Sequence, residues 1–161
     1  MKPRLYIETT IPSYLTSRHS KDVVIAGHQA TTKLWWEKRR DKFEIFISQL
    51  VIDEISRGDP NAAAERLSAI AEFDELTVPK SVNRLAKRFL REGIIPERAS
   101  TDAAHIALCA VHGVDFLMTW NCTHIANAAI QRRLKTICAE EEFSLPLICT
   151  PEELMGEDYV G

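Results

Sequence analysis

The sequence lacks the features that mark fibrous, disordered or membrane proteins. Glycine and proline are sparse, at 6 and 7 of 161 residues, and no stretch is compositionally simple, which excludes collagen-like and disordered architectures. No apolar run approaches the ~20 residues that a membrane span requires, and no apolar signal-peptide core follows Met1–Arg4. These absences predict a soluble cytoplasmic protein without a membrane partner.

Basic and acidic residues are nearly balanced, and the cysteines have no spacing typical of a zinc site or a disulfide framework. The 20 basic and 23 acidic side chains give a net charge of −3, which excludes a polycation that coats nucleic acid but permits a local basic surface. The cysteines have no CxxC spacing, and a reducing cytoplasm would keep them as thiols. We interpret all of them as small apolar core residues rather than a disulfide or zinc framework; they are Cys109, Cys122, Cys138 and Cys149.

The chain does contain a regular alternation of short apolar segments and helical patterns. Strands are expected at 5–7, 44–48, 76–78, 114–119 and 147–149. Strands that alternate with helices predict right-handed crossovers and a parallel sheet covered on both faces. No repeat or linker divides the chain. We therefore expect one domain, 1–161, of the α/β class: a three-layer α/β/α sandwich with a central five-stranded parallel sheet.

Local signals place the helices between these strands. Ser48 is positioned to cap a helix at 49–56, and Gly113 to end the helix before the fourth strand. Other helices are expected at 23–40, 61–73, from 80 to 91, from 101 to 112 and from 121 to about 141. Thr150 and Pro151 have the pattern of one more helix start near the C-terminus.

Four polar residues fall near the expected carboxyl ends of the strands, where open α/β sheets bind ligands. They are Glu8 after the first strand, Glu54 in the helix after the second, Asp102 in a helix first turn and Asn121 after the fourth strand. Asp102 alone could serve the helix dipole, Asn121 could be a helix cap, and Glu54 could face solvent. Glu8 is harder to explain, because a carboxylate that closes a buried strand needs a partner or a cation.

A divalent cation is the partner that such a group would take. Carboxylates that converge repel one another unless a cation neutralises them, and Mg²⁺ or Mn²⁺ takes oxygen ligands while bridging to phosphates. Such a metal activates water and stabilises charge on a transferring phosphoryl group, which is the chemistry of phosphodiester hydrolysis. The candidate catalytic and metal-binding residues are Glu8, Glu54, Asp102 and Asn121.

Segments around these residues resemble the motifs of the PIN domain in order and approximate spacing. They are 6–10, Glu54, 102–107 and 117–121, and the likeness is nearest to stand-alone VapC-like toxins and extends over essentially the whole chain. The resemblance implies a PIN-like domain and an Mg²⁺- or Mn²⁺-dependent endoribonuclease, a hydrolase of RNA in a toxin–antitoxin system. It also implies control by a cognate antitoxin protein and suggests a homodimer.

Two residues depart from the family pattern, which usually has Asp where this chain has Glu8 and Asn121. Glu8 keeps the charge and extends the carboxylate by one methylene, whereas Asn121 keeps one neutral oxygen and loses a charge. The alternative function is therefore a catalytically weak or inactive PIN-like module that binds RNA or protein. Thr9 and Thr119 match hydroxyl positions that would orient the carboxylates or a metal-bound water.

Histidine and cysteine offer a second kind of metal site. Asp102 and His105 are three residues apart and share a face of the expected helix, and Cys122 and His124 follow the fourth strand. A mixed Asp/His/Cys set would suit Zn²⁺. Cys122 and His124 lack the spacing of a usual zinc ligand pair, so Mg²⁺ or Mn²⁺ is favoured.

Basic residues recur on several expected helix surfaces. One helix face would carry Lys80, Arg84, Lys87, Arg88 and Arg91, and shorter clusters lie at 38–40 and 132–135. If these surfaces border the carboxylates, they would supply salt-dependent phosphate contacts to RNA. Trp120 has two interpretations: a core aromatic, which we favour, and a surface on which an unpaired base stacks.

Overall fold

Five parallel strands form one sheet in the order β3-β2-β1-β4-β5. The structure is a computed structural model and describes residues 1–159. The strands are β1 Arg4–Ile7, β2 Glu44–Ser48, β3 Asp74–Leu76, β4 Phe116–Met118 and β5 Leu147–Cys149. Tyr6 in the central strand pairs with Phe46 on one side and Leu117 on the other. The predicted five-stranded parallel sheet is confirmed.

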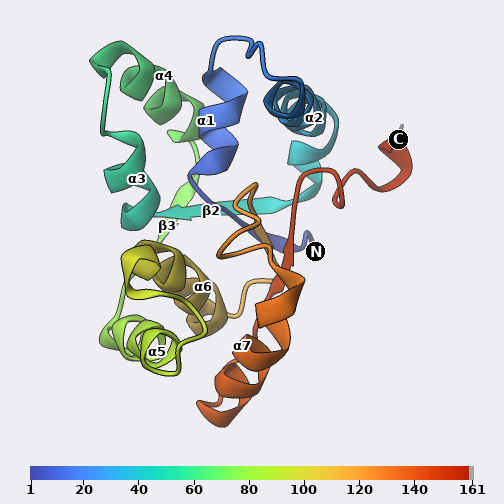
Figure 1. Cartoon of the computed structure of the whole chain (residues 1–161). Helices are drawn as coiled ribbons and strands as arrows, with labels where there is room; N and C mark the ends of the chain where they lie inside the picture. The colour runs from blue at the N-terminus through green and yellow to red at the C-terminus, as the bar shows by residue number, and fades with distance from the viewer. Residues whose placement is uncertain (160–161) are drawn as a thin grey trace.

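Helices cover both faces of this sheet (Figure 1). They are α1 Thr10–Thr16, α2 Val23–Arg39, α3 Gln49–Ile55, α4 Pro60–Ile70, α5 Lys80–Arg91, α6 Ser100–His112 and α7 Ala128–Glu140, with 3₁₀ turns at Arg40–Lys42, Glu97–Ala99 and Gly156–Asp158. Helices α1, α2 and α4 lie on one side, α5, α6 and α7 on the other, and α3 follows the carboxyl end of β2. The predicted α/β class and the three-layer sandwich are confirmed.

The direction of the chain through the sheet reverses between β1 and β4. From β1 the chain proceeds outward to β2 and β3, then crosses through α5 and α6 to β4 on the other side of β1 and continues to β5. In open α/β sheets such a reversal, at the carboxyl ends of the strands, is where ligands bind. Glu8 and Thr119 each follow directly on one of these two strands.

Several local signals act as the sequence predicts. The Ser48 hydroxyl accepts a hydrogen bond from the Leu50 amide at 3.2 Å and so caps α3. Gly113 ends α6 with a φ of +62°, a left-handed conformation that glycine adopts at little cost. The Ser48 cap begins the carboxylate-bearing helix α3 immediately after β2, and Gly113 ends α6 before β4.

Several predicted boundaries differ from the structure: β4 is Phe116–Met118 instead of 114–119, α4 is Pro60–Ile70 instead of 61–73, and three other differences have clear causes. Helix α7 begins at Ala128, because Asn121 opens a series of turns and Asn127 is the cap that accepts from the Ala129 amide at 3.0 Å. Strand β3 ends at Leu76, since its partner Ser48 is where β2 turns into α3. After Thr150 the chain makes turns and a 3₁₀ segment instead of an α-helix.

Burial confirms most of the predicted core. Of the four cysteines, Cys122 is exposed, which corrects its assignment to the core, and the other three are buried. Trp120 is 9% exposed, stacks on the His28 ring at 3.9 Å between centroids, and donates its indole N–H to the Thr32 hydroxyl at 2.7 Å. Trp120 is therefore a core aromatic. Within residues 1–159, none of the helices combines the length and apolarity of a membrane span.

Candidate metal centre

Glu8 is a buried carboxylate, with only 3% of its surface exposed. Its backbone amide extends the β1–β4 ladder by donating to the Met118 carbonyl at 3.1 Å, which directs the side chain into the carboxyl edge of the sheet. Oε1 accepts hydrogen bonds from the Thr10 amide (3.0 Å), the Thr10 hydroxyl (2.6 Å) and the Thr119 hydroxyl (2.7 Å). Across residues 1–159, no hydrogen bond reaches Oε2 and no Lys or Arg pairs with the carboxylate.

Glu54, on α3, is held in a similar way and is about one-quarter exposed. Its Oε1 accepts from the Thr9 hydroxyl at 2.8 Å and contacts His105 Nε2 at 2.5 Å. Burial acts to raise the pKa of Glu54, but the hydrogen bond with His105, together with the smaller effect of the hydrogen bond from Thr9, lowers it below its usual value. Glu54 is thus ionised at neutral pH, as a metal ligand must be.

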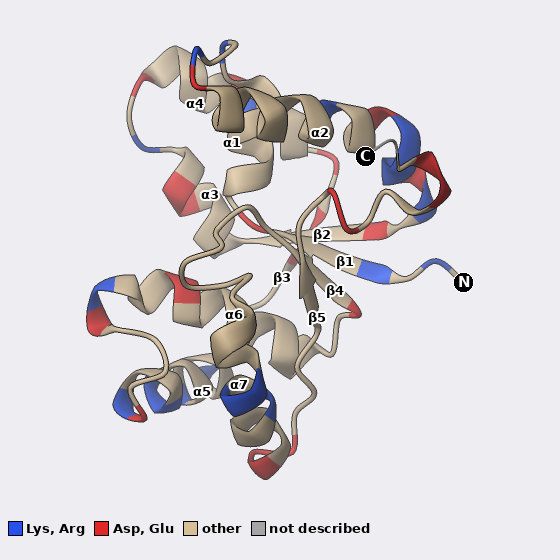
Figure 2. Cartoon of the chain, turned by 45° about the vertical axis from the view of Figure 1, so that its right-hand side comes forward, with Lys and Arg blue, Asp and Glu red and all other residues tan. Residues whose placement is uncertain are grey.

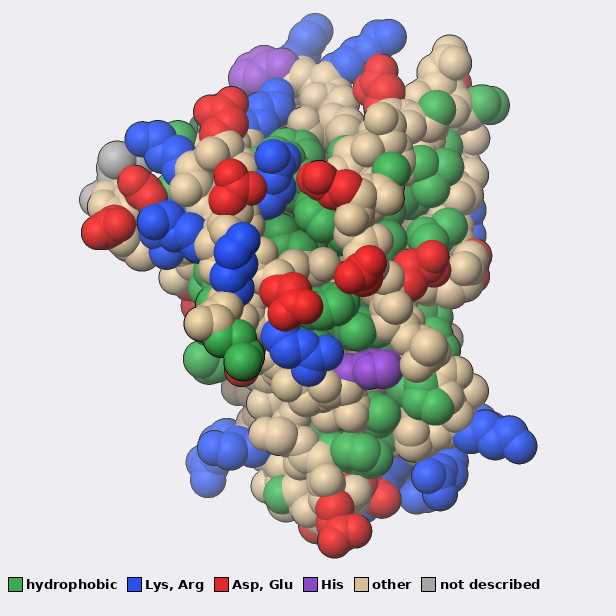
Figure 3. All heavy atoms as spheres, turned by 180° about the vertical axis from the view of Figure 1, so that it is seen from behind, with side chains coloured by type: hydrophobic (Ala, Val, Ile, Leu, Met, Phe, Trp, Pro, Cys, Tyr) green, Lys and Arg blue, Asp and Glu red, His purple; other side chains and the backbone are tan. Residues whose placement is uncertain are grey.

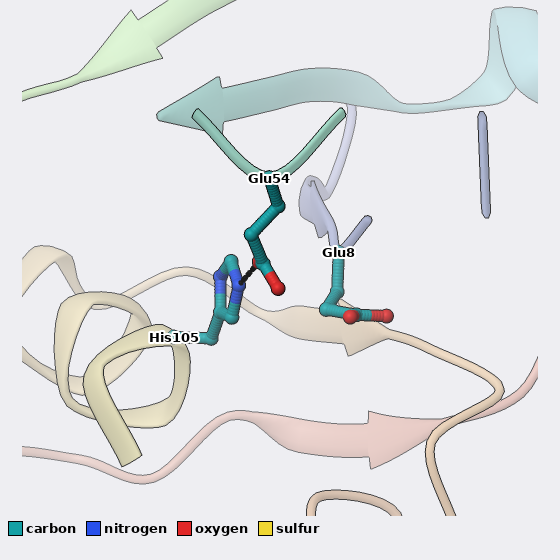
Figure 4. Close-up of side chains that lie close together, drawn as sticks. All are labelled: Glu8, Glu54 and His105. Atoms are coloured by element: carbon teal, nitrogen blue, oxygen red, sulfur yellow. Dashed lines mark hydrogen bonds and ion pairs between the residues drawn. The ribbon is translucent and has the colours of Figure 1, made fainter. Parts of the chain in front are cut away.

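Three side chains lie close together at this point, and Glu54 points toward His105 (Figure 4). Glu8, Glu54 and His105 each offer one potential ligand atom, and these atoms lie within 4.8 Å of one another. They come from the end of β1, from α3 and from α6, so the fold joins positions far apart in the chain. A buried carboxylate without a positive partner, beside a second carboxylate, fits a hard divalent cation that prefers oxygen ligands.

His105 is fully buried and contacts more than Glu54. Its Nδ1 lies 2.7 Å from the Tyr6 hydroxyl, which in turn lies 2.8 Å from the Ser48 hydroxyl. From the sequence, His105 is predicted only as a zinc ligand, and its contact with Glu54 is not predicted. The available signal was the position of His105 one turn after Asp102 in an otherwise apolar helix.

Asp102 and Asn121 form a neighbouring pair. Burial raises the pKa of Asp102, although the neighbouring Asn121 side chain acts to lower it. The Asn121 carbonyl oxygen accepts the His124 amide at 3.0 Å. Asp102 lies outside the group of three, but the charge of Glu54 acts on its pKa. The four residues predicted from sequence therefore lie as two pairs around the same edge of the sheet.

The hydroxyls next to these residues orient the carboxylates. Thr9 donates to Glu54 and Thr119 to Glu8, as described above, and the Asn121 amide donates to the Thr119 hydroxyl at 2.9 Å. Thr10, which is not among the residues predicted from the sequence, makes two of the bonds to Glu8 and also accepts the Trp120 amide at 2.8 Å. The repeated threonine after Glu8 was the signal for it.

The alternative zinc set does not assemble in the described part of the chain. Among residues 1–159, the group of metal-binding side chains within reach of one another is Glu8, Glu54 and His105, without Cys122 or His124. The Cys122 residue is exposed, but its thiol is partly desolvated. This partial desolvation and the charge of Glu153 raise the pKa of the thiol. A raised thiol pKa disfavours the thiolate that zinc requires.

The basic clusters are only partly available to a ligand. Figure 2 shows basic segments on α5 and α7, and on the face drawn in Figure 3 basic and acidic side chains are interspersed. Arg88 contacts Glu140, Glu141 and Glu92 at 2.9, 2.8 and 3.5 Å. Several other predicted basic residues are exposed, namely Lys80, Arg84, Lys87, Arg91, Arg132, Arg133 and Lys135.

Comparison with known proteins supports the fold. No family model matches the sequence, and no curated protein does either. Among solved structures, the crystal structure of VapBC2 from Rickettsia felis, bound to a DNA fragment from its promoter, is similar with a TM-score of 0.56. The identity is 12%, and the match covers 91% of this chain and 97% of the other. The chain has a PIN-like fold of the VapC type.

Proposed function

We propose that the protein is a divalent-metal-dependent ribonuclease of the PIN toxin type. The observation that carries the proposal is Glu8, a buried carboxylate with one free oxygen, placed beside Glu54 at the reversal point of the sheet. A cation at this place would offset the burial of the charge, and no basic side chain among residues 1–159 does so. Mg²⁺ and Mn²⁺ match this set of oxygens.

The acidic and amide side chains would hold the metal, and the neighbouring threonines would orient them. Glu8 and Glu54 would hold Mg²⁺ or Mn²⁺, and Asp102 and Asn121 would complete the ring of oxygens around them. The bound metal supplies neutralisation of phosphate charge and activation of water. Thr10 and Thr119 fix the rotamer of Glu8, and Thr9 fixes Glu54, so both carboxylates are oriented before a substrate arrives.

RNA and a protein antitoxin are the proposed partners. Exposed basic side chains of α5 and α7 would contact RNA phosphates, with affinity that falls as salt rises. The antitoxin, a homodimeric state and a cytoplasmic location follow from the likeness to PIN toxins, and the similar solved structure is itself a VapBC2 assembly. A short reading frame beside the gene, encoding an acidic or amphipathic partner, would support this assignment.

Incubation of the purified protein with single-stranded RNA and Mn²⁺ or Mg²⁺ tests the proposal. We expect cleavage that chelation by EDTA abolishes, together with a rise in melting temperature when metal is added, because an ion that binds only the native state stabilises it. The alternative, an inactive PIN-like binding module, predicts that RNA binds and stays intact. If the protein neither cleaves RNA nor shows a metal-dependent shift in melting temperature, the proposed activity is contradicted.

Replacement of Asp102 by Asn should strongly reduce cleavage and preserve the fold. The two side chains have the same shape, so the change removes the charge that completes the proposed site, and we expect a loss on the order of 10²-fold or more. Because Asp102 lies outside the group of three, its replacement should weaken metal affinity less than Glu54→Gln does. Cleavage rates and calorimetric metal titrations of both variants check this. Wild-type cleavage by Asp102→Asn would show that the site is assigned wrongly.

A further inference from the structure

A chain of hydrogen bonds connects the N-terminus of α3 with the carboxylate of Glu54. It runs from the Leu50 amide through the hydroxyls of Ser48 and Tyr6 to the ring of His105, with donor–acceptor distances of 3.2, 2.8 and 2.7 Å, and ends at Glu54 Oε1. The interior members Ser48, Tyr6 and His105 are all fully buried. Four separate elements, β1, β2, α3 and α6, contribute to it.

When the His105 imidazole is neutral, the two ends of this hydrogen-bond chain determine which atom donates in every bond. An ionised carboxylate only accepts, so His105 Nε2 carries the proton and donates to Glu54. Nδ1 then accepts from the Tyr6 hydroxyl, and the Tyr6 oxygen accepts from Ser48. The Leu50 amide, which only donates, completes the chain at Ser48. Each polar atom of the chain is therefore satisfied, and the ring has one tautomer and one orientation.

This arrangement leaves one carboxylate oxygen of Glu8 and one of Glu54 without a hydrogen bond among the described residues. Thr9 and His105 both bond Oε1 of Glu54, and the three donors around Glu8 all bond its Oε1. In the part of the chain that is described, no hydrogen bond reaches Oε2 of either residue. Donors on one oxygen fix the carboxylate plane while the second oxygen stays available for a cation.

We propose that His105 is a positioning residue that holds Glu54 for the metal, and that Tyr6 acts through His105 by fixing its tautomer. The inference rests on the proposed function, since it concerns the same metal centre. It assigns a role to the buried polar residues Tyr6 and Ser48, which contact neither Glu8 nor Glu54 by any described hydrogen bond. The competing role is direct ligation of the metal by His105 Nε2.

Two amide replacements of His105 distinguish the roles of its two ring nitrogens, Nε2 and Nδ1. The amide nitrogen of Gln in His105→Gln reaches the place of Nε2 and keeps a donor for Glu54, whereas that of His105→Asn reaches the place of Nδ1 and does not. We expect Mn²⁺ affinity within about 3-fold of wild type for His105→Gln and about 10–100-fold weaker for His105→Asn. Calorimetric Mn²⁺ titration measures both, and melting temperatures of the metal-free proteins report the cost of each change in the core.

Tyr6→Phe removes one hydroxyl and keeps the ring in the core. If Tyr6 acts through His105, this change should weaken Mn²⁺ binding in wild type by about 3–10-fold but have no further effect in the His105→Gln background. A purely structural role would lower the melting temperature and leave Mn²⁺ affinity unchanged in every variant. That result, or equal affinities of the Gln and Asn variants, would overturn the positioning role and leave the proposed function intact.

Nitrogen-15 spectra of labelled histidine test the geometry directly. For metal-free wild type we expect a protonated Nε2 and an unprotonated Nδ1 on His105, and the Nε2 proton should persist when Mg²⁺ is bound. Loss of that proton on binding would show direct ligation, and the opposite tautomer would overturn the direction of the chain. Absence of any Mn²⁺ or Mg²⁺ binding by wild type would overturn both this inference and the proposed function.

Discussion

Glu8→Gln should abolish divalent-metal binding and RNA cleavage while the fold is retained. The Gln carbonyl oxygen takes the place of Oε1 and continues to accept from Thr10 and Thr119, so the local hydrogen bonds survive. The buried charge, which is the attraction for the cation, is lost. Because this electrostatic interaction is preorganised, we expect cleavage to fall on the order of 10²–10³-fold.

Thermal unfolding with and without Mn²⁺ provides the measurement. Metal at 100 times its Kd should stabilise wild type by about 2.7 kcal/mol and Glu8→Gln by nothing measurable. The matched control is Glu65→Gln, which removes the same charge from an exposed position on α4 and should behave as wild type. Mn²⁺ stabilisation that persists in Glu8→Gln would rule out Glu8 as the residue that attracts the metal.

The sequence predicted the layers of the fold better than the boundaries of its elements. Alternation of apolar and amphipathic segments is a local property, so the five strands and their parallel sheet could be inferred from it. The start of α7 could not, because Asn121 and Asn127 both have the chemistry of a cap and only the turns between them decide which one begins the helix.

The candidate site was predictable as a set of residues but not as a set of contacts. Glu8 stood out because a carboxylate at the end of a buried strand needs a partner. The contact between Glu54 and His105 depends on how α3 and α6 approach the sheet, which is a matter of tertiary packing that no local pattern encodes. The same holds for the link from Tyr6 to His105, which joins residues 99 positions apart.

Asn121→Asp should tighten metal binding and destabilise the metal-free protein. Asn121 has two effects: its oxygen accepts the His124 amide at 3.0 Å, and its side chain acts to lower the pKa of Asp102. Aspartate keeps the first and replaces the second with like charge, which would raise the pKa of Asp102 further. Without metal, we expect the free energy of unfolding to fall by about 1–2 kcal/mol.

With metal, the same added charge becomes favourable. In a pocket less screened than bulk water, one more negative charge close to the cation contributes on the order of 1–3 kcal/mol, or about 10-fold or more in affinity. Nuclease activity should rise with it. Isothermal titration of both proteins at one ionic strength measures the affinity, and Asn121→Ser, which keeps a cap oxygen without the charge, is the matched control.

If Asn121→Asp binds the metal no more tightly than wild type, the role of Asn121 is only to cap its turn. A fourth acidic role would then have to come from elsewhere, and Asp115 is the acidic residue nearest to β4 in sequence. Its carboxylate, however, accepts the Arg4 amide at 2.7 Å, at the opposite end of β1 from Glu8. Asp115 therefore cannot replace Asn121, and the metal would be held by Glu8, Glu54 and Asp102 with one charge fewer than in the usual PIN pattern.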